Sequence, residues 1–76
     1  MARAYLRIWV KTGYEDSVRE ELMQIKAVTA ADLTTGDQDL MVVIEADAYE
    51  DIVQTVLGQV RLLKGVDRTI TSLAVG

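Results

Sequence analysis

The chain has 76 residues, a formal net charge of −4, and neither cysteine nor histidine. The missing cysteines exclude disulfides, zinc–thiolate sites and iron–sulfur clusters, and the missing histidines remove the commonest metal ligand and the commonest general base. An acidic chain repels a phosphate backbone, so we expect no direct binding of nucleic acid, and the 50% share of hydrophobic residues is high for so small an interior and favours self-association.

Residues 3–11 alternate between aliphatic side chains and aromatic or charged ones, which predicts a β-strand with one aliphatic face. Thr12 stands three residues before Glu15, a spacing typical of a capping box at the start of a helix. The apolar positions that follow recur at helical spacing, at Val18, Leu22 and Ile25. We therefore predict a helix that is capped by Thr12, has Glu15 in its first turn and ends near Lys26.

Residues 28–35 form a weaker, partly polar run that is typical of an edge strand. Gly36 and Asp37 follow, and because glycine can take the positive φ that a tight reversal needs, we predict a Gly-Asp turn here. The run from Leu40 to Ile44 contains no polar residue. Neither face of such a strand can be left to water, so we predict that it lies in the middle of the sheet.

A second capping-box spacing joins Asp47 and Glu50 and predicts a second helix. Its apolar stripe is expected at Ile52, Val53, Val56, Val60 and Leu63, with Arg61 and Lys64 in the last turn. Gly65 stands where a left-handed residue usually ends a helix. Residues 66–75 are rich in β-branched side chains and predict a last strand.

The predicted order is βαββαβ, an α+β arrangement in which two βαβ halves are joined by a hairpin. This is the ferredoxin-like plait, a four-stranded antiparallel sheet with the first and third strands central and, because crossovers are right-handed, both helices on one face. The other face should stay uncovered. It is nevertheless apolar, because Tyr5 and Trp9 share one side of the first strand, and Met41 and Val43 share one side of the third. An exposed apolar face usually marks an interface, so we predict that two subunits pack sheet to sheet.

The segment 34–39 groups hydroxyl, amide and carboxylate side chains around a flexible glycine. A carboxylate can hold an ammonium group, and backbone N–H groups at such a turn can hold a carboxylate, a combination that suits a free amino acid. The alternative is an ordinary polar hairpin whose aspartates bond to their own backbone. Asp37 and Asp39 could also form an acid–base pair, which requires a buried carboxyl. Tyr5 and Trp9 could stack on nucleic-acid bases, a role that the acidic charge opposes.

Four segments carry a resemblance to a known family: AYLRIWV, LMQIKAV, TTGDQDLMVVIEA and GVDRTITSLAV. In them the chain resembles the effector-binding domain of Lrp/AsnC-type transcriptional regulators, the RAM domain, over essentially its whole length. The family's hairpin usually reads Thr-Gly-any-aromatic-Asp, and Thr35, Gly36 and Asp39 match it. Gln38 stands in the aromatic place. The resemblance implies that an amino acid binds around this hairpin, between neighbouring dimers, at Gly36, Asp39, Thr35, Asp37 and Gln38 and at Thr69 and Thr71 of the last strand.

The resemblance also implies a non-enzymatic sensor module without a cofactor, which forms dimers and rings of dimers such as octamers. Full regulators of the family carry a helix-turn-helix domain, whereas this chain begins directly in its first strand, so residues 1–76 are expected to be a single stand-alone RAM domain. Such a domain can bind an effector, or it can be a ligand-free subunit that co-assembles with a full-length regulator. A small dimeric plait enzyme is the third hypothesis and requires a cleft with a buried Asp or Glu base.

No apolar run is long enough to span a bilayer, and the N-terminus lacks the pattern of a signal peptide. We therefore expect a cytoplasmic protein with no membrane partner. Its expected partners are a second copy of itself, a small amino acid effector and, in the second hypothesis, a full-length Lrp/AsnC-type regulator.

Overall fold

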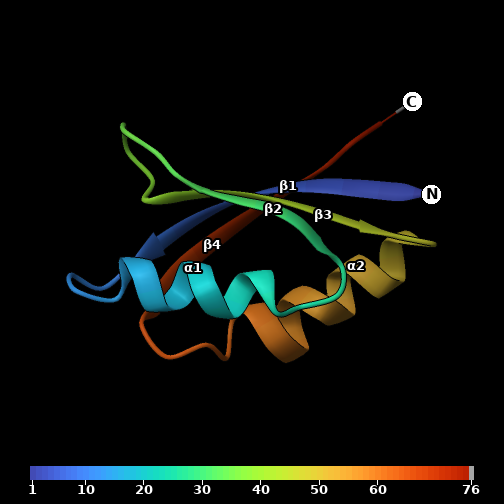
Figure 1. Cartoon of the computed structure of the whole chain (residues 1–76). Helices are drawn as coiled ribbons and strands as arrows, with labels where there is room; N and C mark the ends of the chain where they lie inside the picture. The colour runs from blue at the N-terminus through green and yellow to red at the C-terminus, as the bar shows by residue number, and fades with distance from the viewer. Residues whose placement is uncertain (76) are drawn as a thin grey trace.

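The strands and helices follow one another in the predicted order (Figure 1). The structure is a computed structural model that describes residues 1–75. Its elements are β1 (Ala2–Val10), α1 (Glu15–Met23), β2 (Val28–Leu33), β3 (Leu40–Ala46), α2 (Tyr49–Thr55), a π-helical turn η1 (Val56–Val60) and β4 (Val66–Leu73). The strands form an antiparallel sheet of order β2-β3-β1-β4, and both helices cover one face of it. The ferredoxin-like prediction is therefore confirmed, including the two central strands.

The buried core lies between the sheet and the helices. Alternate residues of β1 and β3 point into it, as the strand pattern predicted: Ala2, Ala4, Leu6, Ile8, Leu40, Val42 and Ile44. The helical layer contributes Val18, Leu22, Ile52, Val56 and Val60. Val53 was predicted on the same stripe, and this was wrong: it is 45% exposed, because one step along a helix from the buried Ile52 turns a side chain away from the core.

Neither helix begins with the predicted capping box. The residues that precede the helices are Tyr14 and Ala48, and neither makes a side-chain capping hydrogen bond. Before α1, the N–H of Tyr14 donates to the carbonyl of Lys11 (3.0 Å) and closes a turn around Thr12, so the helix starts later than a Thr12 cap requires. Before α2, the extended residue is Ala48 rather than Asp47, and its carbonyl accepts the first helical hydrogen bonds.

The helices also end earlier than predicted. α1 ends at Met23 rather than near Lys26. α2 ends at Thr55 and gives way to η1, which contains a glycine, a poor helix former. Arg61 and Lys64 therefore lie beyond the helix instead of in its last turn.

The sheet face opposite the helices is not covered by any element of residues 1–75 (Figure 1). We call it the open face. The strand register places on it Arg3, Tyr5, Arg7 and Trp9 of β1, Asp32 of β2, Met41, Val43 and Glu45 of β3, and Arg68, Ile70 and Ser72 of β4. Its centre is apolar and its margins are charged, a distribution typical of a subunit interface.

Candidate functional site

The β2–β3 hairpin carries most of the predicted site residues. Its loop spans residues 34–39, and the N–H of Thr34 donates to the carbonyl of Asp39 (3.0 Å) across its base. Gly36 has a φ of +113°, the positive value that the sequence predicted. The reversal is wider than the predicted two-residue turn, and its tip bends away from the helical layer (Figure 1).

Asp39 anchors the hairpin to the central strand. Its carboxylate oxygen Oδ2 accepts the backbone N–H of Val10 (2.8 Å), and its own N–H donates to the carbonyl of Ile8 (3.0 Å). The side chain is half-buried. In the alternative of an ordinary hairpin, the carboxylate of Asp39 would bond to the backbone of its own turn. It bonds instead to the backbone of β1, so Asp39 has the structural role of holding the hairpin against that strand.

This anchor predicts different effects for two substitutions. Asp39→Ala leaves the partly buried Val10 N–H without a partner, so we expect a loss of about 1–2 kcal/mol in the free energy of unfolding. Asp39→Asn keeps an oxygen acceptor in place and should lose less than about 1 kcal/mol. Urea unfolding of both variants checks this, and equal losses would contradict a structural role for the hydrogen bond.

Arg7 of β1 reaches the hairpin from the open face. Its Nε donates to Oε1 of Gln38 (3.4 Å), and a terminal nitrogen lies 3.6 Å from Oδ2 of Asp37. The Gln38 amide also donates to the hydroxyl of Thr34 (3.3 Å). Gln38 is thus held between Arg7 and Thr34. Arg7 was not predicted as a site residue, although it shares one side of the first strand with Trp9 and therefore lies on the open face.

Asp37 and Asp39 do not form an acid–base pair. Asp37 faces Arg7 with a side chain that is 80% exposed, while Asp39 faces Val10. Both aspartates lie in the loop between β2 and β3, where the side-chain alternation of a strand does not apply. Among residues 1–75 no polar or charged residue is buried, so the buried carboxyl that this hypothesis requires is not found there.

Thr69 and Thr71 lie on the other side of the sheet from the open face. They are in register with Ile8 and Leu6, whose side chains point toward the helices. Together with Val53, Val56, Leu57 and Arg61 they line a groove of about 260 Å³ between β4 and the end of the second helix. One chain therefore does not bring these threonines into the same site as the hairpin.

Two arginines flank the indole of Trp9 at the hairpin end of the open face. The guanidinium carbons of Arg7 and Arg68 lie 5.1 and 4.6 Å from its ring centroid. At the other end, Arg3 and Glu45 form an ion pair (2.9 Å). Side-chain hydrogen bonds, first with the neighbouring Tyr5 and then with Glu45, raise the pKa of Arg3.

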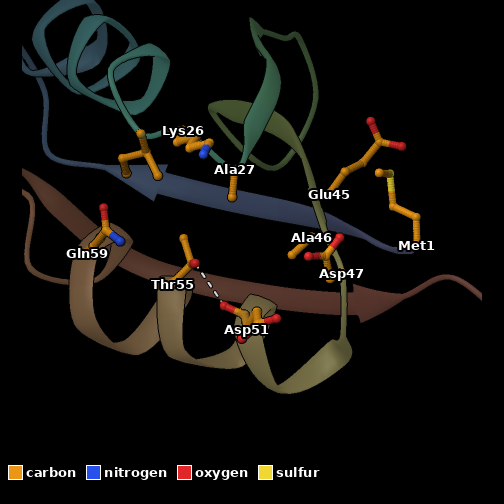
Figure 2. A pocket seen from close by; sticks show the side chains of 10 residues that line it. Met1, Lys26, Ala27, Glu45, Ala46, Asp47, Asp51, Thr55 and Gln59 are labelled. Carbon is orange, nitrogen blue, oxygen red and sulfur yellow. Dashed lines mark hydrogen bonds between the residues drawn. The ribbon is translucent and has the colours of Figure 1, made fainter.

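A separate cavity of about 540 Å³ lies at the end of the sheet away from the hairpin (Figure 2). Asp51 and Thr55 of α2 and Gln59 of η1 face it, Lys26 lies across from them, and Asp47 lines it just after the end of β3. The hydroxyl of Thr55 donates to the Asp51 carbonyl (2.8 Å), so it is already engaged. No predicted site residue lines this cavity.

Among residues 1–75, no helix is long and apolar enough to cross a membrane. In the same part of the chain, no group of three Asp or Glu side chains is arranged to hold a metal ion.

Comparison with known proteins gave a family match over nearly the whole chain. The profile of the Lrp/AsnC ligand binding domain matches residues 3–76. The crystal structure of FFRP-DM1 superposes with a TM-score of 0.94 at 28% identity, covering 99% of this chain and 100% of that one. The protein TTHA0845 from Thermus thermophilus superposes with a TM-score of 0.95 at 25% identity, covering 100% of this chain and 95% of that one.

A longer protein shares the fold at lower identity. The transcriptional regulator NMB0573 from Neisseria meningitidis, solved as a complex with L-Met, superposes with a TM-score of 0.83 at 16% identity. The superposition covers 99% of this chain and 50% of that one. No curated protein sequence matched the chain.

Proposed function

This chain belongs to the Lrp/AsnC ligand binding domain family, and we propose on that basis that it is a non-catalytic regulatory module that binds a small amino acid and assembles with copies of itself. The observation that carries the proposal is the family match over residues 3–76, which includes the complete hairpin. Regulators of this kind act on transcription, so we expect the module to work in the cytoplasm.

The hairpin has groups for both ends of an amino acid. The Asp39 carboxylate accepts one hydrogen bond from Val10, and a carboxylate accepts several, so it can also receive an ammonium group. Gly36 is exposed and has a positive φ, and backbone N–H groups around it can receive a carboxylate. Thr35, Asp37 and Gln38 complete the ligand-facing set that we propose. Gln38 in the place of an aromatic residue favours a polar effector over an apolar one.

A complete site needs more than one chain. The hairpin tip bends toward the open-face side, whereas Thr69 and Thr71 line the groove on the helical side of the sheet. If both groups contact one effector, as the family resemblance implies, the hairpin must come from one subunit and the threonines from another. We therefore propose that the effector binds between neighbouring dimers, in an assembly such as a ring of dimers.

This arrangement makes binding and assembly reciprocal. An effector that contacts two subunits stabilises the assembly in which both contacts exist, and the assembly raises the affinity for the effector by the same factor. A coupling of about 1–3 kcal/mol is enough to shift the populations several-fold. The signal would then be the number of associated subunits rather than a change of shape within one subunit.

Native mass spectrometry with and without a pool of the twenty amino acids tests this function. We expect a dimer or larger assembly whose abundance rises with one amino acid bound. Asp39→Asn keeps the Val10 anchor but removes the charge, so it should lose the bound amino acid and remain folded. A fixed assembly that carries no amino acid at millimolar concentrations would contradict the sensor function.

The second candidate is a ligand-free subunit that co-assembles with a full-length Lrp/AsnC-type regulator. The observation that favours it is Gln38, which is engaged by Arg7 and Thr34 in place of the family's aromatic wall. Co-expression with the Lrp/AsnC-type regulators of the source organism separates the candidates. Mixed assemblies that form without any amino acid favour the subunit, whereas assemblies of this chain alone favour the sensor.

A further inference from the structure

The cavity at the end of the sheet away from the hairpin has an apolar floor (Figure 2). Ile25 is buried there, and the half-buried Ala27 and Ala46 pack against the core. Each alanine places only a methyl group on this floor, so the space between α2 and the connection from α1 to β2 stays open. Its volume of about 540 Å³ lies within the range that is typical of small-molecule sites. The cavity is therefore large enough to hold a small metabolite.

The rim of the cavity is polar and carries both signs of charge. Asp51 and Gln59 face the cavity from α2 and η1, and Lys26 lies across from them (Figure 2). Asp47 lines it just after the end of β3. The hydroxyl of Thr55 donates to the backbone carbonyl of Asp51 rather than to its carboxylate. The rim therefore presents two carboxylates and one ammonium group around one space.

These three charges have no partner of opposite sign in the part of the chain that the structure describes. The ion pairs formed within residues 1–75 lie on the open face and at the hairpin, and neither includes Asp47, Asp51 or Lys26. Glu45 also lines the cavity, but its charge is already compensated by Arg3. Because Lys26 and Asp51 face the same space without reaching each other, a molecule in that space can contact both.

The distribution of charge defines the molecule that fits. Two carboxylates call for two ammonium groups, and the single lysine calls for one carboxylate. A short aliphatic chain that joins these groups suits the apolar floor. A free amino acid with an amine at the end of its side chain, such as lysine, has all of these parts. An amino acid with an apolar side chain leaves one carboxylate of the rim unmatched, and a dicarboxylic amino acid brings like charges together.

We propose that this cavity is a second ligand site, which binds a diamino acid of the lysine type. Lys26 receives the carboxylate of the ligand, and Asp47 and Asp51 receive its two ammonium groups. No residue of the hairpin loop lines this cavity, and neither do Thr69 and Thr71. The site is therefore separate from the effector site of the proposed function and does not depend on it, and one chain can bind different molecules at the two ends of its sheet.

Titration of the ¹⁵N-labelled chain with L-lysine, followed through the amide chemical shifts, tests the site. We expect saturable shifts around Lys26, Asp47 and Asp51, with a dissociation constant on the order of 1 mM, and little change in residues 34–39. Two matched ligands divide the contacts between the two halves of lysine. Cadaverine lacks the carboxylate and L-norleucine lacks the side-chain amine, and each should bind roughly three- to tenfold more weakly than lysine.

Three substitutions of exposed side chains assign the contacts. Asp51→Asn should weaken the binding of lysine roughly three- to tenfold, because it removes one of the two carboxylates. Lys26→Gln should weaken the binding of lysine but not that of cadaverine, which has no carboxylate to lose a partner. Glu50→Gln is the matched control, because it changes the charge equally one residue away and Glu50 does not line the cavity. The amide spectrum of each variant reports whether it remains folded.

Each outcome has a distinct meaning. Shifts centred on residues 34–39 would assign lysine to the hairpin and overturn the second site, and so would the absence of any saturable shift at about 10 mM. Equal losses in Asp51→Asn and Glu50→Gln would show a general effect of charge and not a contact. Cadaverine that binds as tightly as lysine would overturn the role of Lys26. None of these outcomes touches the proposed effector site, which Asp39→Asn tests separately.

Discussion

Gly65→Ala is expected to lower the free energy of unfolding by about 2–5 kcal/mol, a large share of the stability of so short a chain. Two effects act together. Gly65 has a φ of +97°, a conformation that side chains with a Cβ rarely adopt. A Cβ at this position would also lie 2.5 Å from Cβ and Cγ of Tyr14, a distance at which something must move. The backbone of Gly65 is held by its hydrogen bond with Lys11, and the side chain of Tyr14 packs against the core, so neither can move easily.

Gly13 provides the matched control. Its φ is +94°, close to that of Gly65, but an added Cβ would meet nothing within 4 Å. Gly13→Ala should therefore lose only the conformational part, about 1–2 kcal/mol. Urea unfolding of the two variants isolates the steric part as the difference between them. Equal losses would show that the contact with Tyr14 adds nothing. In a Tyr14→Gly background, which removes the Cβ as well as the ring, the Gly65→Ala loss should shrink toward that of Gly13→Ala.

The position of Gly65 links this prediction to the site. Its carbonyl accepts the N–H of Lys11 (2.8 Å), the residue after β1, while Val10 donates to the Asp39 carboxylate. The end of β1 is thus tied to the start of β4 on one side and to the hairpin on the other. Strain caused by a side chain at position 65 should therefore disturb the hairpin as well as lower the global stability.

The sequence patterns were sufficient for the fold because they repeat. Alternation in residues 3–11, the apolar run at Leu40–Ile44 and the helical stripes each place several side chains, and the core confirms them apart from the exposed Val53. Single-residue cues were less reliable. Thr12 and Asp47 have the spacing of capping boxes, but a backbone turn before α1 and the extended Ala48 before α2 shift both helix starts. Whether a residue caps a helix depends on the backbone conformation at that one position, and no repeated pattern along the chain supports such a prediction.

The candidate site was predictable only in part. The positive φ of Gly36 could be predicted, because a glycine stands there at a reversal between two strand-like runs. The hydrogen bond between Asp39 and Val10 joins residues 29 positions apart and depends on the strand register. The same register decides that Thr69 and Thr71 point toward the helices, a choice that their alternation leaves undetermined. The family resemblance placed the hairpin residues and the two threonines near one effector. In one chain, the structure places the hairpin and the threonines on different sides of the sheet.

Val43→Lys is expected to dissociate the dimer while leaving each subunit folded. Val43 lies on the open face in register with Tyr5, at the centre of the sheet-to-sheet interface that the sequence predicts, and it takes no part in the buried core. In a separate subunit a lysine here keeps its charge in water, so the free energy of unfolding of the subunit should change little. In the dimer, symmetry buries two such charges without partners, and we expect the dissociation constant to rise at least roughly a thousandfold.

Leu62→Lys is the matched control, because Leu62 is 74% exposed and lies outside the open face, and its substitution should leave the dimer intact. Sedimentation velocity reports the association of both variants, and circular dichroism reports their folding. The Val43→Lys subunit also tests the two-chain site. If the effector contacts the hairpin of one subunit and Thr69 and Thr71 of another, a folded monomer must lose amino acid binding although all of its own site residues are intact. A monomer that binds the effector with wild-type affinity would show that the hairpin alone forms the site, and the reciprocity between binding and assembly would then be lost.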